Sequence, residues 1–340
     1  MLDAIRNYFA ELTERFGNGW NRFWFAPRDA LTLSLVRVLT GLIALYSHAT
    51  LSFDLLRFFG PHGLTPVDAV QSWIGNRYGF SYLNHLHEPS ELWAAHFVGF
   101  VILLLFTVGL WTRVTSVLAT LVVLSTIHRA PMLAGEFESV LAMVMVYLCI
   151  GASGDYLSVD YWLRRRRQLQ RPLYDREPRI RPSCPLTTIS TRLIQVHLTV
   201  VYVSMGISKL DGSLGDVWWG GTAIWWMLAR PERRIVDLTG WLHNHIYIIN
   251  VWTHATVLFE LSFPLLVWNR LARPLMLVVA TVMWILEIIA SGLAMFGLTM
   301  IVANLVFVSP ETLRSLLFAR SAAEPVQART EPTPQMAETT

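Results

Sequence analysis

Lysine is almost absent from this chain of 340 residues. Lys209 is the only lysine, and every other permanently charged basic side chain is an arginine. Arginine stays charged under all practical conditions, whereas a lysine that loses contact with water lowers its pKa and can become a neutral base. Because the chain uses arginine everywhere else, the stretch GISKLDG that contains Lys209 is the first candidate for a functional site.

Charged residues and cysteines are also scarce. Only 15% of the residues are charged, against about a quarter in ordinary soluble domains, and 54% are apolar. Cys149 lies in an apolar run and Cys184 in a polar loop, which supports neither a disulfide framework nor a metal cluster. Nucleotide-binding motifs of the GxGxxG and Walker types are absent. The net charge of +3 says little about nucleic acid, because the arginines lie in loops, and no nucleic-acid partner is predicted. The composition favours a membrane protein.

The apolar residues come in runs long enough to cross a bilayer, which takes roughly 20 residues per helix. They predict an all-α polytopic membrane domain over residues 30–308, a helical bundle of transmembrane helices with additional interfacial helices. The eight expected spans are 30–50, 91–111, 114–130, 137–153, 190–209, 252–269, 272–291 and 293–308. Residues 1–29 are predicted to form an amphipathic lead-in helix and not a cleaved signal peptide, and residues 309–340 a disordered cytoplasmic tail.

The arginines predict the orientation of this bundle. The segment 155–181 between the fourth and fifth spans carries eight of them. Cytoplasmic loops of membrane proteins are rich in Lys and Arg, so this segment and, with an even number of spans, both termini are expected on the cytoplasmic side. Lys209, at the end of the fifth span, then lies toward the outer face.

The residues after Lys209 suggest a pocket. A polar turn that contains Asp211 is followed by a tryptophan-rich segment with Trp218 and Trp219. That segment is too short to span, and it is expected to lie in the outer interface or to form the wall of an apolar pocket. Two interpretations of Lys209 stay open at this point. It is either a general base in a partly buried site or a span-end side chain that reaches the lipid headgroups.

Ionisable residues inside the predicted spans are further candidates, because such residues are costly in a bilayer. Glu138 begins the fourth span, Glu260 lies near the middle of the sixth, and Glu287 lies toward the outer end of the seventh. Tyr202 precedes Lys209 by seven residues and so lies on the same helix face. The alternative for each acid is a neutral carboxyl group that only joins neighbouring helices. Nothing supports the ligand geometry of a metal site, and none is predicted.

Five short motifs follow one another along the predicted spans. They are RVLTGL at 37–42, FGPHGLTP at 59–66, GLWTR at 109–113, YLSVD at 156–160 and YVSMGISKLD at 202–211. Their order and spacing resemble the membrane domain of vitamin K-dependent gamma-glutamyl carboxylases and of their bacterial relatives, the horizontally transferred transmembrane (HTTM) domain proteins. The resemblance covers the whole predicted membrane domain and implies a bacterial cytoplasmic (inner) membrane.

The resemblance implies a role for Lys209. In the carboxylases the matching lysine deprotonates a reduced quinone of the vitamin K or menaquinone type, and O2 and CO2 are consumed in the carboxylation of a secreted protein or peptide. The expected catalytic residues are then Lys209, Glu138 and Tyr202. The expected pocket residues are His128, Asp211, Trp218, Trp219, Glu260 and Glu287. Glu138 stands near the place of the catalytic histidine of the carboxylases, and their large lumenal domain has no counterpart after residue 308.

Two other functions fit the same sequence. Some relatives act as non-enzymatic membrane helpers in the maturation or export of a secreted peptide, and the chain could equally be a lipid-binding or quinone-binding protein. In either case Lys209 would contribute its charge and not its basicity.

Overall fold

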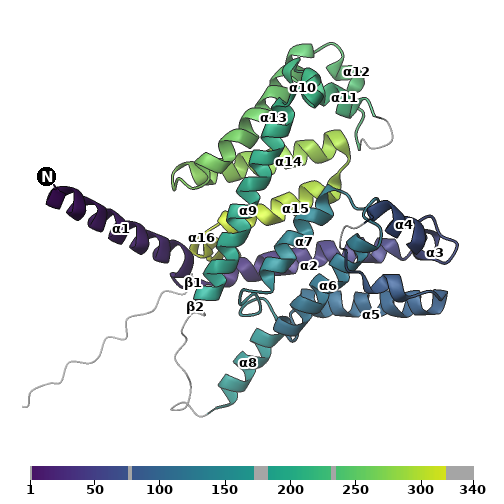
Figure 1. Cartoon of the computed structure of the whole chain (residues 1–340), viewed down its shortest axis with the longest axis horizontal. Coiled ribbons are helices and arrows are strands. Elements are labelled where there is room, and N and C mark those ends of the chain that lie inside the picture. The colour runs from purple at the N-terminus through teal and green to yellow at the C-terminus, as the bar shows by residue number, and fades with distance from the viewer. Residues whose placement is uncertain (1, 76–78, 172–182, 231–234, 319–340) are drawn as a thin grey trace, which may run out of the picture.

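The computed structural model describes residues 2–75, 79–171, 183–230 and 235–318, and this part of the chain is almost entirely helical. Within it, each predicted span coincides with a helix in the body of the molecule (Figure 1). These helices are α2 (Leu31–Leu51), α5 (Pro89–Val108), α6 (Thr112–Arg129), α7 (Glu136–Leu148), α9 (Pro185–Leu210), α13 (Ile246–Leu266), α14 (Ala272–Ser291) and α15 (Ala294–Asn304). The prediction of a helical class is therefore confirmed.

Five of these helices, α2, α5, α9, α13 and α14, are long and apolar enough to cross a membrane. A sixth candidate is the bent pair Ala294–Phe307 and Pro310–Leu317, whose two halves meet at 111°. Leucines such as Leu258, Leu265 and Leu275 are largely exposed on the outside of α13 and α14. Such apolar surface suits a lipid bilayer and not water, and the exact number of spans stays a prediction.

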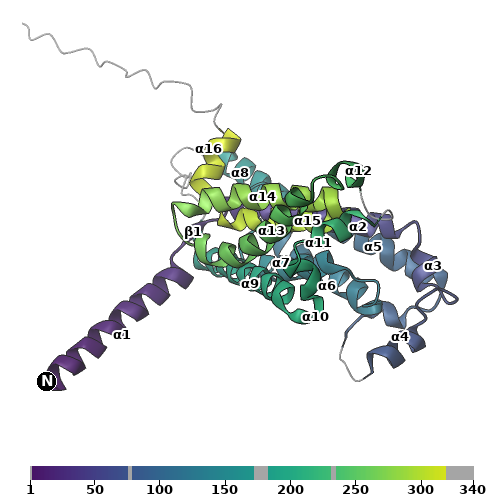
Figure 2. The same ribbon diagram turned by 90° about the horizontal axis from the view of Figure 1, so that it is seen from above.

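The helices diverge from one end of the bundle, where two short strands pair (Figures 1 and 2). The strands β1 (Arg28–Asp29) and β2 (Ser183–Cys184) are antiparallel, with Arg28 opposite Cys184. Three helices also lie at this end, α1 (Leu2–Phe25), α8 (Val159–Gln170) and α16 (Pro310–Phe318). We call it the arginine-rich end, because it includes the described part of the loop that set the predicted orientation.

The opposite end of the bundle carries only short helices. They are α3 (Leu55–Phe59), α4 (Val67–Ile74), the 3-10 turn η1 (Tyr82–His85), α10 (Gly212–Trp219), α11 (Ala223–Leu228) and α12 (Thr239–Leu242). Helix α15 continues into a second 3-10 turn, η3 (Leu305–Phe307), and then into α16, which occupies the beginning of the predicted tail. The rest of that tail, residues 319–340, and the segment 172–182 of the arginine-rich loop lie outside the described residues.

The interior joins two groups of helices. Helix α2 packs on α5, and α9 packs on α13, while α7 and α15 each contact both α2 and α9. Large apolar side chains such as Phe106, Met145, Phe263 and Met300 are completely buried between them. Close side-chain packing of this kind is what holds helices together in a bilayer, where lipid chains are as apolar as the side chains themselves.

The turn between α5 and α6 shows why the sequence bends there. Gly109 ends α5 with a φ of 74°, in the left-handed region that glycine adopts without strain. A Cβ atom at this position would also lie 2.1 Å from Nη1 of Arg37, a side chain that is fully buried in α2. The glycine of GLWTR therefore permits both the turn and the close approach of the arginine.

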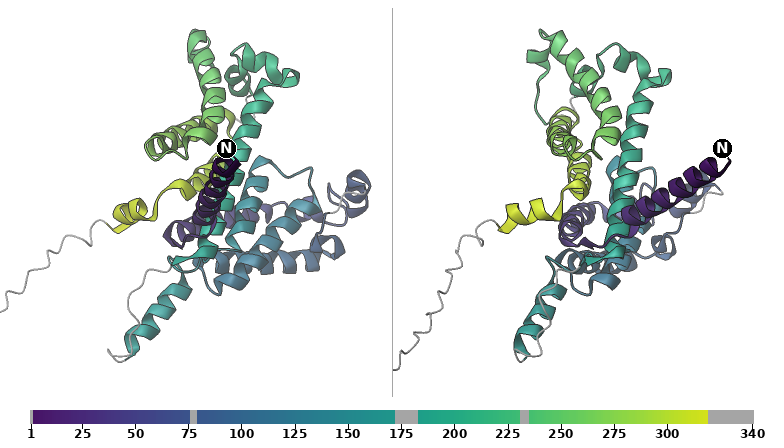
Figure 3. Two further views of the ribbon diagram at one scale, coloured as in Figure 1. Left: turned by 60° about the vertical axis from the view of Figure 1, so that its left-hand side comes forward. Right: turned by 90° about the vertical axis from the view of Figure 1, so that its left-hand side faces the viewer.

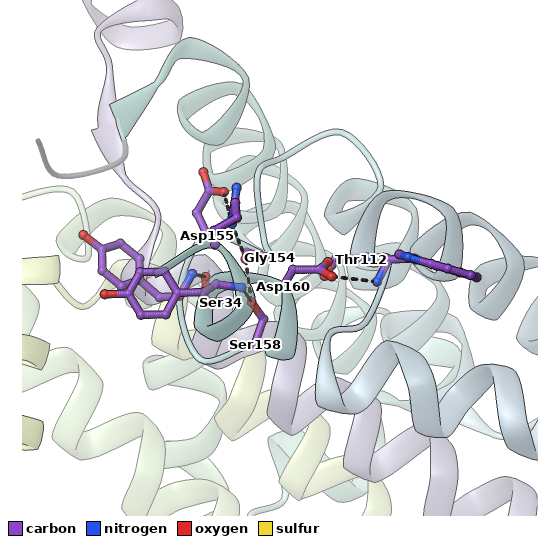
Figure 4. Close-up of polar contacts among 10 residues, drawn as sticks. Ser34, Thr112, Gly154, Asp155, Ser158 and Asp160 are labelled. Atoms are coloured by element: carbon purple, nitrogen blue, oxygen red, sulfur yellow. Dashed lines mark hydrogen bonds and ion pairs between the residues drawn. The ribbon is translucent and has the colours of Figure 1, made fainter. Parts of the chain in front are cut away.

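Asp160 fixes the same turn from α8. Its carboxylate accepts hydrogen bonds from the amide of Trp111 (2.9 Å) and from the amide and hydroxyl of Thr112 (both 2.8 Å) (Figure 4). Burial raises the pKa of Asp160, but these hydrogen bonds, with help from Arg164, outweigh the burial and hold the pKa below its ordinary value. The motifs at 109–113 and 156–160 therefore meet and form one structural unit.

Candidate functional site

A cavity of about 530 Å³ lies beside Lys209, between α7, α9, α13 and α14. Much of its wall is apolar and includes Phe259, Trp284 and Phe296, and α10 and α11 add Trp218 and Met227. Its polar lining consists of Glu136, Ser139, Ser208, Lys209, Thr256, Glu260 and Glu287. We call it the lysine cavity.

Lys209 stands in the last turn of α9 and is turned into this cavity. Its Nζ donates a hydrogen bond to Oε1 of Glu260 and lies 4.9 Å from the ring centroid of Trp218. The side chains of Lys209 and Glu260 are only 16% and 5% exposed. An ammonium group is stabilised by a carboxylate and by the face of an indole ring. The side chain is therefore held by the protein and does not extend toward lipid headgroups.

Gly206 explains why α13 comes so close to this lysine. A Cβ atom on Gly206 would lie 2.7 Å from Cδ2 of Leu261, so a larger residue would require the Leu261 side chain or the helices to shift. Glu260 precedes Leu261 on α13 and lies beside Lys209 in the same contact of the two helices. The glycine of GISKLDG thus favours the close approach at which the ion pair forms.

Acids outnumber the lysine in the cavity. Glu287 from α14 and Glu136 from the first turn of α7 line it together with Glu260. Glu287 interacts electrostatically with Lys209, Glu260 and Glu136. The second carboxyl oxygen of Glu260, Oε2, is buried and has no hydrogen-bond partner among the described residues. One ammonium group cannot balance three carboxylates in an apolar place, so this site favours groups that share or exchange protons.

Tyr202 lies behind the wall of the lysine cavity. Its side chain is completely buried, and its hydroxyl accepts hydrogen bonds from Nε1 of Trp284 and Nδ2 of Asn304, both at 2.8 Å. Trp284 also lines the cavity, so one side chain separates the Tyr202 hydroxyl from it. The structure gives Tyr202 a position that supports Trp284 and no contact with the cavity itself.

Glu138 faces a different cavity. This second cavity, of about 420 Å³, lies between α2, α6 and α7 and is also lined by His48 and Asp54. Oε2 of Glu138 accepts a hydrogen bond from the amide of Gly135 (2.8 Å) and so caps the start of α7. Residues two apart on a helix point about 200° apart, which is why Glu136 and Glu138 serve different cavities.

Three other candidate residues also lie away from the lysine cavity. His128, in the last turn of α6, has its Nδ1 3.1 Å from the carbonyl oxygen of Phe80. Asp211 is exposed at the junction of α9 and α10. Trp219 is largely exposed, and its Nε1 donates a hydrogen bond to the carbonyl oxygen of Leu210 (3.3 Å). The structure therefore brings together Lys209, Trp218, Glu260 and Glu287 from the set expected from the sequence.

Glu136 and Trp284 are two of the cavity residues that were not expected from the sequence. Glu136 carries a recognisable signal, because it is an acid that interrupts an apolar run. Trp284 gives no such signal in the sequence, since a tryptophan within an apolar helix is ordinary. Its place in the cavity wall, beside Tyr202, is seen only in the structure.

The site thus combines a cavity large enough for a ligand, a mainly apolar lining and an ion pair that can exchange a proton. Among the described residues no group of three or more His, Cys, Asp or Glu side chains is arranged to hold a metal ion. Comparison with known protein families, with curated proteins and with solved structures finds no match for this chain.

Proposed function

We propose that the lysine cavity binds a reduced quinone and that Lys209 moves protons for it, as a general base. The observation that carries the proposal is the position of the chain's only lysine, inside a largely apolar cavity and paired with a buried carboxylate. Intramembrane ionisable residues that face a cavity commonly mark substrate or proton pathways. A lysine differs from arginine at such a place because it can release its proton.

The cavity fits the ring of a quinone. Its volume of about 530 Å³ falls within the roughly 300–1,000 Å³ of ordinary ligand pockets. The aromatic side chains of Trp284, Phe259 and Phe296 offer flat apolar contacts, and the unpartnered Oε2 of Glu260 can accept a hydrogen bond from a ligand hydroxyl. A reduced quinone would supply a hydroxyl proton and the electrons for a reaction with O2.

The ion pair can prepare Lys209 to act as a base. When the proton on Nζ moves to Oε1 of Glu260, a neutral amine and a neutral acid replace two buried charges. Nζ can then accept a proton and become an ammonium group again, with the carboxylate of Glu260 restored once that acid passes its proton on. Glu287 and Glu136 line the same cavity and can take the proton from there.

We further propose that the chain is an HTTM-type relative of the carboxylases, with eight spans in a bacterial inner membrane. The arginine-rich end would then be cytoplasmic and the lysine cavity would face outward, in agreement with the positive charge near one end of the bundle. The reaction that we propose for such a relative is the carboxylation of a secreted peptide with O2 and CO2, supported by proton transfer at Lys209. Glu138, near the expected place of the carboxylase histidine, lines the second cavity.

A second candidate is a quinone-binding or lipid-binding protein without catalysis, such as a helper in peptide maturation. The observation in its favour is that Glu138 and Tyr202, two of the three expected catalytic residues, do not line the lysine cavity. In that case Lys209 would only neutralise Glu260.

The variant Lys209→Arg separates the two functions, because it keeps the positive charge and removes the base. The full chain is purified in detergent with reduced menaquinone, bound quinone is measured by mass spectrometry, and O2 uptake is followed. We expect quinone binding to be retained and O2 uptake to fall about a hundredfold or more.

The matched control is Arg165→Lys on the exposed face of α8, which makes the reverse exchange away from the cavity. It should leave both measurements unchanged. Full O2 uptake by Lys209→Arg would show that Lys209 is not the base. Bound quinone without any O2 uptake in the natural chain would favour the binding protein.

A further inference from the structure

Three arginines from separate elements meet at the arginine-rich end. Arg28 lies in β1, Arg192 in the second turn of α9, and Arg273 at the start of α14. Arg192 interacts electrostatically with both of the others. We call them the arginine trio. Three like charges repel one another, so a nearby negative charge would stabilise their meeting.

Arg192 is held in place by neutral groups. Its Nε donates a hydrogen bond to the carbonyl oxygen of Phe23 (3.2 Å), and Nη1 donates to Oε1 of Gln195 (2.9 Å). The guanidinium group lies over the rings of Phe23 (4.1 Å) and Trp268 (5.7 Å). These contacts fix the orientation of the group, but they leave its charge without a carboxylate.

Arg273 is fixed in the same way. Its Nε and Nη2 donate to the carbonyl oxygens of Val267 (2.9 Å) and Trp268 (3.3 Å) in the turn before α14. Its other charged neighbour is Arg270, which adds to the repulsion. Carbonyl groups therefore position this guanidinium group without neutralising it.

Within the part of the chain that the structure describes, the carboxylates at this end do not balance the arginine trio. Asp29 accepts a hydrogen bond from Nη2 of Arg314 (2.7 Å), so it already belongs to another ion pair. Glu311 interacts electrostatically with Arg28 and supplies one negative charge. Burial and then the charge of Arg273 lower the pKa of Arg28, and Glu311 only partly opposes them. Counting the described residues alone, a net positive charge of about two is left on the trio at neutral pH.

An apolar groove adjoins the arginine trio. It runs between α1 and α9 and is lined by Arg15, Phe16, Gly19, Trp20, Phe23 and Trp24, with Val196 on the α9 side. Phe23 thus belongs to both the groove and the contacts of Arg192. Nε1 of Trp24 is buried and has no hydrogen-bond partner among the described residues. A donor of this kind can bind an ester or phosphate oxygen.

Helix α1 extends away from the bundle (Figure 3). Leu12, Phe16 and Trp20 are exposed along it, at the four-residue spacing of one helix face. A helix with such an apolar face typically lies in the boundary between lipid headgroups and acyl chains. Aromatic residues beside arginines are common at the same depth.

We infer that the arginine trio binds the phosphate group of an anionic phospholipid whose acyl chain lies in the groove between α1 and α9. Guanidinium groups bind phosphate with paired hydrogen bonds, and basic pockets between membrane helices on the cytoplasmic side bind anionic headgroups. The phosphate would supply the missing negative charge, and the acyl chain would cover Phe16, Trp20 and Trp24. This site is separate from the lysine cavity.

The test measures lipid binding to the full chain in detergent. Phosphatidylglycerol, phosphatidylcholine or inorganic phosphate is added, and the midpoint of thermal unfolding is recorded against concentration. We expect phosphatidylglycerol to raise the midpoint and phosphatidylcholine to have little effect. The double variant Arg192→Gln/Arg273→Gln should bind phosphatidylglycerol at least about tenfold more weakly, since each charge-assisted contact accounts for roughly a factor of ten.

The control Arg165→Gln/Arg166→Gln removes the same charge from α8 and should keep the natural affinity. If the double variant does not fold, Arg28→Gln is used, with a smaller loss of affinity expected. Equal stabilisation by both lipids, or an unchanged affinity in the variants, would overturn the inference. An equal rise with inorganic phosphate alone would assign the arginine trio to a soluble anion and not to a lipid.

Discussion

Helix α9 carries a basic side chain near each end, and the two have opposite surroundings. Arg192 lies among other arginines, fixed by carbonyl groups and aromatic rings. Lys209, roughly 25 Å further along the helix at 1.5 Å per residue, lies among three glutamates. Arginine keeps its charge in either place, whereas lysine can give up its proton. On the two proposals above, one end of α9 would bind an anion and the other end would move a proton.

The largest effect is expected at the lysine end of α9. The variant Lys209→Met leaves Glu260 as a buried carboxylate without its partner, which should lower the free energy of unfolding by about 3 kcal/mol. The measurement is denaturant unfolding in detergent micelles, followed by tryptophan fluorescence.

The double variant Lys209→Met/Glu260→Gln is the control for this loss. It removes both charges, so most of the lost stability should return. If the loss of unfolding free energy in the double variant equals the sum of the losses in the two single variants, the two side chains are not coupled. The comparison along α9 then fails.

An intermediate effect is expected in the middle of α9, at Tyr202. The variant Tyr202→Phe leaves the buried donors of Trp284 and Asn304 without an acceptor, at a cost of about 2 kcal/mol in the free energy of unfolding. Quinone binding and O2 uptake should change little, because the hydroxyl does not reach the cavity.

Tyr147→Phe is a matched control, since the Tyr147 hydroxyl bonds to His197 at an exposed position and its loss should have a small effect. A loss of O2 uptake in Tyr202→Phe that exceeds its loss of stability would instead place Tyr202 in the reaction.

The smallest effect is expected at the arginine-rich end, at Asp160. The variant Asp160→Asn removes a carboxylate that caps the start of α6 and should lower the free energy of unfolding by about 1 kcal/mol at neutral pH. Because the pKa of Asp160 is lowered in the folded chain, the ionised carboxylate stabilises the fold fully above its unfolded pKa of about 4.

This contribution is lost as the pH falls through the lower folded pKa. The difference between the natural chain and Asp160→Asn should therefore shrink below about pH 4, which unfolding at a series of pH values measures. Asp155→Asn, which removes only a partly exposed ion pair with Arg164, should lower the free energy of unfolding by less than about 1 kcal/mol at neutral pH. A difference that does not depend on pH would contradict the capping role.

The helices could be predicted from the sequence because an apolar run reports helix length directly. The predicted boundaries differ from the observed ones mainly where polar residues continue a helix. Helix α9 begins at Pro185, five residues before the predicted span. Its first residues are polar threonines that continue the helix, and proline is tolerated in the first helical turn. Helix α7 ends at Leu148, earlier than predicted, ahead of the turns around Gly151 and Gly154.

The candidate site could be predicted only in part. Lys209 is conspicuous in the sequence, but its partner Glu260 is 51 residues away and is reached through the packing of α13 on α9. The choice between Glu136 and Glu138 depends on the rotation of α7, which apolar periodicity cannot fix in a helix with apolar residues on every side. Pair contacts and helix rotation are properties of the packed bundle.

The scarcity of lysine has a practical consequence for experiments on this protein. Reductive methylation with isotope-labelled formaldehyde modifies amines and leaves guanidinium groups intact. Apart from the α-amino group, Lys209 is the only amine in the chain, so the labelled methyl signal of Lys209 would report from inside the cavity. Its chemical shift would follow the protonation of the site and the arrival of a ligand without any introduced probe.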